Sequence, residues 1–223
     1  MEARIRYSHP GTRESQDQEL QEICCLSPDH HLAVGFLLGA FLWLVILAQV
    51  STKARLSSQF NPEVLLEKGN IQLEYLFGCK NLVMLQIFKI SKLDDWKREC
   101  KNNQKLSVAE LARQGAKIET DLNQALASVS AQKPGQRRAY SNFASEGKCL
   151  VITECFGLAA LTYLHVVMSG AHPDLPGIYD SVSRGMDALT AMRDQKLLRR
   201  VVWPVCVIGC MVWEVSRVVS GLL

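Results

Sequence analysis

The stretch from Cys149 to Met168 constrains the fold more than any other part of the chain, because it is apolar on almost every side. Its few polar residues, with the residue that follows the stretch, recur at helical spacing and form one narrow stripe: Glu154, Thr162, His165 and Ser169. A helix with so narrow a polar stripe buries nearly its whole surface, so other helices must surround it. We therefore predict that this stretch is the central core helix of an all-α domain.

Two further helices are predicted after the core helix. Ser169-Gly170 ends the core helix, and His172-Pro173-Asp174 begins the next one. Asp194 is the predicted N-cap of a third helix, from Gln195 to Cys210, in which Pro204 introduces a kink or a break. The second helix has one apolar face, formed by Leu175, Ile178, Val182, Met186 and Leu189. The predicted core residues of the region are Leu161, Leu164, Val167 and Trp203.

Start and stop signals also divide the chain upstream. Asn61-Pro62-Glu63 begins a short helix that Gly69 ends, and Gly78 closes another short turn. A longer helix is predicted from about Asn81 to Glu99. Ser107-Val108-Ala109-Glu110 is a capping box, in which each end residue's side chain satisfies a backbone N–H of the other. The helix that it begins has one apolar face, formed by Leu111, Gly115, Ile118, Leu122, Leu126 and Val129.

The domain organisation is predicted from these patterns. Residues 1–26 are mostly polar and are predicted to form a disordered tail. Residues 27–223 are predicted to form one irregular multi-helix domain, because no segment alternates with the period of a strand. The segment from Gln132 to Gly147 is a predicted loop within that domain, since neither half alone has enough apolar surface for a separate core.

A second apolar segment leaves a membrane alternative open. Ser27-Pro28-Asp29 is a strong helix start, and the residues from Leu32 to Ala48 are uncharged and apolar throughout. This run is a little shorter than the ~20 residues of a helix that spans a bilayer. We favour a buried helix of the all-α core, and the alternative is a single-pass membrane anchor near residues 32–50.

Composition and cysteine usage exclude several classes of protein. The net charge of +3 is too small for a surface that coats nucleic acid. The N-terminus lacks the apolar core of a signal peptide, and the eight cysteines lie mostly in apolar helical segments. We therefore expect buried, reduced cysteines rather than the disulfide framework of a secreted protein.

Candidate catalytic and metal-binding residues do not form a convincing site in the sequence. Glu154 and Cys155 are neighbours that point about 100° apart on a helix, and His165 lies about 16 Å farther along the axis than Glu154. Cys24-Cys25 are adjacent, and Cys206 and Cys210 lie one helical turn apart with no second ligand pair. We predict that the chain is not an enzyme and has no catalytic, cofactor-binding or metal-binding residues. Its small basic clusters, Arg137-Arg138 and Lys196 with Arg199 and Arg200, are predicted to be solvated.

Short motifs along most of the chain resemble the fungal-specific transcription factor domain. The C-terminal ones are Ala160 to Val167, Ser169-Gly170, Ile178 with Asp180 to Arg184, Leu197-Leu198-Arg199, Val202-Trp203-Pro204 and Gly209-Cys210. The upstream ones are Leu38 to Trp43, Leu76 to Cys79, Leu93 to Lys97 and Leu106 to Ala112. This domain is the helical regulatory region of fungal transcription factors that bind DNA through a zinc binuclear cluster.

The resemblance implies a nuclear protein that regulates transcription by RNA polymerase II. A zinc binuclear cluster needs six closely spaced cysteines, and these residues contain no such pattern, so zinc and DNA contact would belong to a module outside them. We expect a truncated or diverged regulatory domain that is incomplete relative to the family, with apolar faces open near Val201 to Leu223. The implied partners are the transcription machinery, a homodimer partner or a small-molecule effector.

Overall fold

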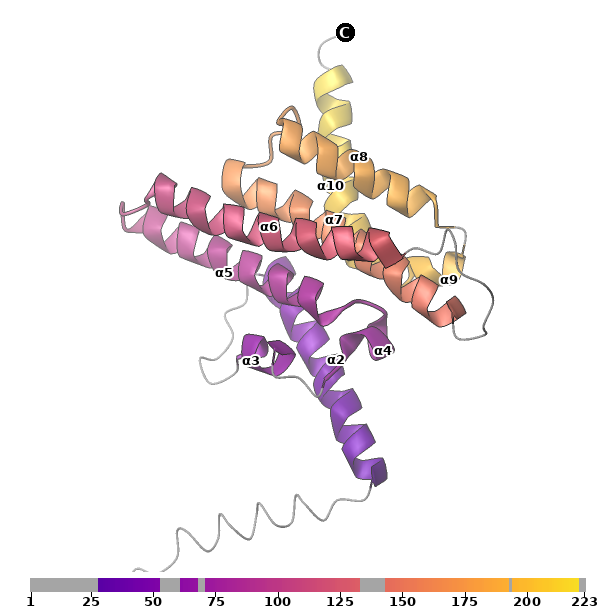
Figure 1. Ribbon diagram of the computed structural model, residues 1–223. Helices are drawn as coiled ribbons and strands as arrows, with labels where there is room; N and C mark the ends of the chain where they lie inside the picture. Colours follow the sequence, from indigo (N-terminus) through magenta and orange to yellow (C-terminus); the bar gives the residue numbers. More distant parts are fainter. Residues whose placement is uncertain (1–27, 53–60, 68–70, 133–142, 193, 221–223) are drawn as a thin grey trace, which may run out of the picture. The chain divides into compact units, whose positions relative to one another are not determined.

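The structure is a computed structural model that describes residues 28–52, 61–67, 71–132, 143–192 and 194–220. These residues form nine helices and no strand, which confirms the predicted all-α class (Figure 1). The helices are α2 (Pro28–Thr52), α3 (Pro62–Glu67), α4 (Leu73–Phe77), α5 (Asn81–Asn102), α6 (Val108–Gln132), α7 (Phe143–Ser169), α8 (Pro176–Thr190), α9 (Gln195–Leu198) and α10 (Val202–Ser220).

The chain divides into two compact units, Met1–Leu38 and Gly39–Leu223. Of the described residues, the first unit holds only residues 28–38, which belong to α2. The second unit contains the rest of α2 and all the other helices, and therefore the core of the fold. The predicted disordered tail, residues 1–26, lies outside the described residues.

Helix α7 is the centre of the second unit, as the sequence predicts. It packs against α5, α6, α8 and α10 (Figure 1). Its side chains Ile152, Phe156 and Leu164 are almost completely buried. The four predicted core residues of the C-terminal region are also buried: Leu161, Leu164, Val167 and Trp203. The prediction that a loop extends to Gly147 is wrong, because α7 already begins at Phe143. Extending an existing helix costs little compared with nucleating one, and a single glycine does not stop it.

An aromatic cluster joins α7 to distant parts of the chain. The ring of Trp43 on α2 stacks on Phe77 at 4.6 Å and meets Phe156 of α7 edge-on at 5.0 Å. Trp203 of α10 stacks on Phe156 at 5.7 Å and meets Tyr163 edge-on at 6.5 Å. Such ring pairs stabilise by about 0.5–1.5 kcal/mol beyond the area that they bury. The C-terminal part of α2 is therefore an integral part of this core.

Thr153 of α7 contacts the backbone of the turn between α4 and α5. Gly78 ends α4 with a left-handed φ of 81°, as predicted, and a Cβ at this position would lie 2.6 Å from the side chain of Ile152. The hydroxyl of Thr153 accepts a hydrogen bond from the backbone N–H of Lys80 at 3.2 Å and lies 3.4 Å from the carbonyl oxygen of Gly78. The turn can approach α7 this closely because glycine has no side chain.

The helix caps agree closely with the sequence signals. The Asn61 side chain accepts from the N–H of Glu63, and the Asp194 carboxylate accepts from the N–H of Lys196 at 2.9 Å. The Ser107 hydroxyl accepts from the N–H of Glu110 at 3.3 Å, which is one half of the predicted capping box. The carboxylate of Glu110 instead accepts from Arg113 and Gln114. These hydrogen bonds lower the pKa of Glu110 to about 2.

Three predictions for the C-terminal helices are wrong in detail. Helix α8 begins at Pro176 rather than at His172-Pro173-Asp174, because a proline holds the residue before it, Leu175, in an extended conformation (ψ 128°). The predicted helix from Gln195 to Cys210 is two helices, and Pro204 lies in the first turn of α10, where its missing N–H costs nothing.

The third difference is the face that α8 buries. Its buried residues are Ile178, Ser181, Val182 and Gly185, whereas Leu175 and Met186, predicted for the apolar face, are both exposed. A Cβ on Gly185 would lie 2.5 Å from Cδ1 of Ile208 on α10. The absence of a side chain at Gly185 therefore lets α8 and α10 approach closely on that side.

Two helices in the described part of the chain are long and apolar enough to cross a membrane, by length and composition alone. The apolar window of α7, Gly147–Ser169, is 72% buried, as expected of a core helix. The window of α2, Leu32–Thr52, is only 28% buried, although Leu42, Trp43 and Ile46 lie in the core. Burial thus accounts for the apolar character of α7 more fully than for that of α2.

Candidate functional site

The polar stripe of α7 is the feature that the sequence singled out, and the structure places it between α6 and α8. His165 Nε2 lies 3.3 Å from Oε1 of Glu119 on α6. The hydroxyls of Thr162 and Ser181 on α8, both buried, lie 3.1 Å apart. The prediction that the stripe forms hydrogen bonds with neighbouring helices is therefore confirmed for these two residues.

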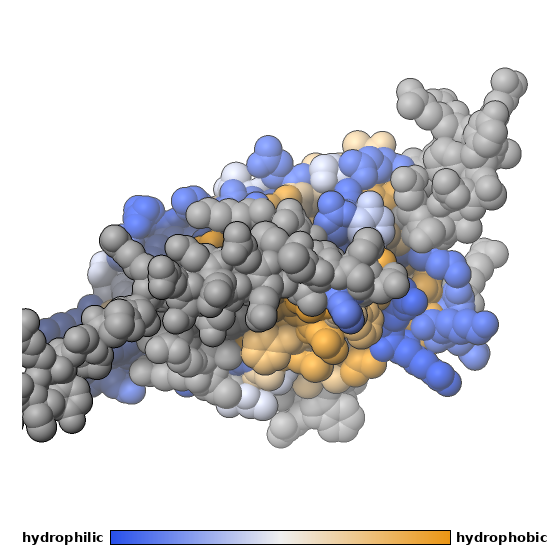
Figure 2. Space-filling view, turned by 90° about the horizontal axis from the view of Figure 1, so that it is seen from below, coloured by the Kyte–Doolittle hydropathy of each residue, from blue (hydrophilic) through white to orange (hydrophobic). Residues whose placement is uncertain are grey.

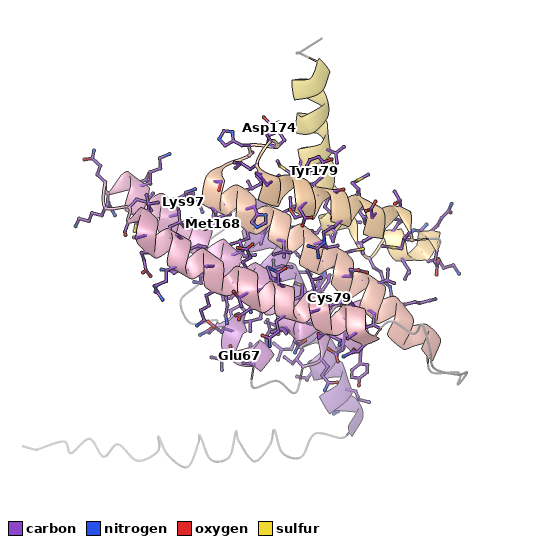
Figure 3. The ribbon with its side chains drawn as sticks, turned by 45° about the horizontal axis from the view of Figure 1, so that its top comes forward. Glu67, Cys79, Lys97, Met168, Asp174 and Tyr179 are labelled. Carbon is purple, nitrogen blue, oxygen red and sulfur yellow. The ribbon has the colours of Figure 1, made fainter. Side chains whose placement is uncertain are left out.

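A lysine of a third helix, α5, contacts the C-terminal end of α7. Lys97 of α5 donates hydrogen bonds from Nζ to the carbonyl oxygens of Val167 and Met168, and Figure 3 shows Lys97 beside Met168. These carbonyls are among those that a helix end leaves without an intrahelical partner, and a cation there is favourable to the helix dipole. Polar contacts therefore surround the C-terminal end of the stripe.

A cleft opens at the other end of the stripe, beside Glu154. Its volume is about 360 Å³, within the lower range of small-molecule sites. Three helices line it, with one residue that follows the third: Leu126 and Ser130 of α6; Val151, Glu154 and Leu158 of α7; Arg184, Asp187 and Ala188 of α8; and Ala191 directly after α8. The cleft combines an aliphatic lining with charged groups, and Arg184 forms an ion pair of 3.1 Å with Asp180, outside the lining. The sequence indicated Glu154 but gave no sign that α6 and α8 would complete a cleft around it.

The three residues considered for catalysis are not assembled into one site. Cys155 is fully buried, whereas its neighbour Glu154 lines the cleft. His165 lies about 16 Å from Glu154 along the helix axis and contacts Glu119 instead. The arrangement provides no pairing of nucleophile and base among these three side chains.

The cysteines correct one prediction. No disulfide forms among the described cysteines, and Cys79 and Cys155 are buried as expected. Cys206 and Cys210, however, are exposed on α10, so the prediction that all eight are buried is wrong. Burial raises the pKa of the Cys79 thiol well above its usual value. Cys24 and Cys25 lie outside the described residues.

Zinc has no suitable ligand set in the described part of the chain. None of its His, Cys, Asp and Glu side chains form a group of three or more that could hold a metal ion. Cys206 and Cys210 alone would supply two ligands, and a structural zinc site needs four.

Of the two small basic clusters predicted from the sequence, one lies within the described residues. Lys196, Arg199 and Arg200 are exposed at α9 and the turn after it, as predicted, and Arg137-Arg138 lie outside the described residues. Apolar side chains are exposed on α10, notably Val202 and Val205, which confirms the expected open apolar face for the part of α10 whose side chains are described, up to Val212. Apolar surface is also present elsewhere, including Phe41 and Leu44 of α2, and Figure 2 shows a hydrophobic region flanked by hydrophilic residues on one face.

Comparison with known proteins gives a consistent family assignment. The model of the fungal specific transcription factor domain matches residues 9–215. The trichothecene biosynthesis transcription regulator of Fusarium sporotrichioides is 31% identical over 201 residues, which cover 90% of this chain and 45% of the relative. The corresponding regulator of Trichoderma arundinaceum is 35% identical over 147 residues, 65% of this chain and 31% of the relative. Transcription factor ntnD of a Nectria species is 29% identical over 194 residues, 80% of this chain and 31% of the relative.

The matches cover only part of each relative. The chain spans less than half the length of each of these three relatives. No solved structure matches it.

Proposed function

Because this chain belongs to the fungal specific transcription factor domain family, we propose that it is the helical regulatory domain of a transcription factor that controls a set of biosynthetic genes. The observation that carries the proposal is the alignment over 90% of the chain with a regulator named for trichothecene biosynthesis. Other relatives are named as cluster transcription factors, for ustiloxin B and for pestheic acid. These names support control of a biosynthetic gene cluster, a role that we propose for this chain in the nucleus.

In this proposal, the helical domain does not itself contact DNA. The chain contains no cysteine pattern of a zinc binuclear cluster, and its net charge is only +3. DNA contact, and the zinc that it requires, would come from a separate module of the same longer protein or of a partner. The helical domain would then modulate transcription through the transcription machinery, a second copy or a small effector.

A reporter fusion tests this function. The full 223-residue chain is fused to a heterologous DNA-binding domain in a yeast strain with a matching reporter gene. We expect the fusion to raise or lower reporter transcription relative to the DNA-binding domain alone. The same fusion with the core substitution Leu164→Ala controls for folding, and it should lose the effect at equal protein level. Reporter output equal to that of the DNA-binding domain alone would contradict the proposal.

A second candidate, a membrane anchor at α2, is supported by one observation. The apolar window of this helix is 21 residues long and only 28% buried. Its length suits a bilayer span. The burial of Trp43 and Ile46 among aromatic and aliphatic side chains of the second unit favours the regulatory domain instead, because a helix that crosses lipid cannot also supply this core.

A further inference from the structure

Helix α10 carries two cysteines on the same exposed side. Cys206 and Cys210 are both exposed, whereas Cys79 and Cys155 are buried. The two exposed residues are four positions apart, so their side chains leave the helix about 40° apart in direction and about 6 Å apart along its axis. The two thiols therefore lie one helical turn apart on a surface that a solute can reach.

The opposite side of α10 is anchored in the core. Trp203, Ile208 and Met211 are buried there, and the ring of Trp203 stacks on Phe156 of α7. Apart from its neighbours in the helix, a Cβ atom added to Gly209 would meet no described heavy atom within 4 Å, so space is open beside the pair. A packed helix therefore sets the separation of the two cysteines before anything binds, which lowers the ordering cost of binding.

The spacing of the pair favours a bridging ion over a disulfide. Residues one turn apart on a helix have Cβ atoms about 5–6 Å apart. A disulfide needs a Cβ–Cβ distance of about 3.5–4.5 Å, so a direct S–S bond between Cys206 and Cys210 would distort the helix. A metal–thiolate bond is about 2.3 Å long, as for zinc, so one ion can join two sulfur atoms that are up to about 4.6 Å apart. The bridging ion fits the spacing that the direct bond does not.

The kind and number of ligands select the ion. In the described part of the chain, no third His, Cys, Asp or Glu side chain joins the pair to form a larger ligand group. Two ligands are too few for structural zinc, and calcium and magnesium prefer oxygen. Soft thiolates favour copper(I), a soft ion for which two thiolates are a sufficient ligand set. The sequence-based prediction of no metal site rested on the lack of a second ligand pair, an objection that applies to zinc but not to copper(I).

We propose that Cys206 and Cys210 bind one copper(I) ion in a two-thiolate site on the surface of α10. Both thiols release their protons to the solvent, and each sulfur forms one bond to copper. The copper stays in its +1 state, so the step consumes no oxidant or reductant. Any effect of copper on transcription rests on the proposed function, whereas binding itself does not.

Titration of the purified full-length chain with copper(I) tests the proposal. The parent for this test carries C24S and C25S, because those two adjacent thiols lie outside the described residues and also offer two ligands. Copper(I) is supplied without oxygen as its bathocuproine disulfonate complex, and the chelator competes with the protein. We expect one copper ion per chain and the ultraviolet absorption of copper–thiolate bonds. The ratio should not change with protein concentration, since one chain supplies both ligands. No copper transferred from the chelator, or one ion shared by two chains, overturns the proposal.

Substitutions locate the ion at the pair. C206S and C210S each leave one of the two ligands, so each should weaken copper binding about 100-fold or more. The double variant V205C/C206S keeps two thiols at exposed positions but places them five residues apart, about 140° around the helix, and should bind as weakly as C206S. C100S removes a thiol elsewhere in the chain and should leave binding unchanged. Binding by C206S or by V205C/C206S that equals that of the parent overturns the site.

A thermal melt of each variant separates lost binding from lost folding. Residues 205, 206 and 210 are exposed, so their variants should melt like the parent, and C206A replaces C206S if the serine lowers the melting temperature. The reporter fusion separates this inference from the proposed function. Copper binding with an inactive reporter fusion retains the site but not the function, whereas an active fusion without copper binding retains the function and removes the site.

Discussion

At the scale of the residue, the neighbours Leu164 and His165 on α7 allow the contribution of buried packing to be compared with that of a polar contact. Leu164 is 1% exposed, so Leu164→Ala should leave a cavity and cost about 2–5 kcal/mol. His165→Gln keeps a polar group within reach of Glu119 and should cost much less, about 1 kcal/mol or below. Thermal melts of both variants with the parent measure this difference. If Leu164→Ala melts like the parent, α7 is not central to the fold.

The cysteines give a second prediction at this scale. Burial raises the pKa of Cys79, so its reactive thiolate is scarce, and reagents cannot reach it in the folded chain. Cys206 and Cys210 are exposed on α10 and should react first. Iodoacetamide labelling at pH 8, followed by mass spectrometry of the peptides, should modify these two before Cys79. In denaturant the difference should disappear, and early labelling of Cys79 in native buffer would show that the α4–α5 turn is open.

At the scale of the element, α2 is the helix whose environment most needs testing. Its residues Leu42, Trp43 and Ile46 are buried, which predicts a helix that belongs to the protein core rather than to lipid. The expressed chain should therefore be released from membranes by carbonate washing without detergent. Leu44→Ala, at a side chain that is 65% exposed, should leave this behaviour and the melting temperature almost unchanged. A requirement for detergent to extract a monodisperse, folded chain would favour the membrane anchor.

Helix α10 has one buried apolar face and one exposed apolar face. Trp203 and Ile208 are buried in the core, whereas Val202 and Val205 are exposed. Exposed apolar patches of this kind promote association, so the chain alone should self-associate as its concentration rises. Val205→Lys should reduce that association, because it places a charge on the patch. Light scattering at several concentrations measures it, and Ser183→Lys on the exposed side of α8 is the matched control.

At the scale of the whole molecule, the small net charge governs what the chain can bind. With +3 and no zinc-cluster cysteines in its 223 residues, it can neutralise few phosphates. Gel-shift titrations should show only weak duplex binding without sequence preference, and even this should vanish between low and physiological salt. A randomised duplex of equal length is the control. A site-specific complex in the nanomolar range at physiological salt would contradict the assignment of DNA contact to a separate module.

The sequence by itself determined the features that depend on a few neighbouring residues. Ser107 and Asp194 cap their helices, and Gly78 ends α4, because each needs only its own backbone and the next few N–H groups. The central position of α7 was also predictable, since its polar residues form only one narrow stripe and the rest of its surface is apolar. The family motifs carried the functional assignment for the same reason: they are local in sequence.

Only the tertiary structure decided what depends on two elements meeting. Glu154 and Thr162 share one stripe of α7, yet Thr162 is buried against α8, whereas Glu154 lines a cleft between α6, α7 and α8. The buried face of α8 likewise depends on Gly185 and its contact with Ile208, a residue of another helix. Periodicity shows which side chains share a face, but the neighbouring helices decide whether that face is covered, because burial is a property of the pair.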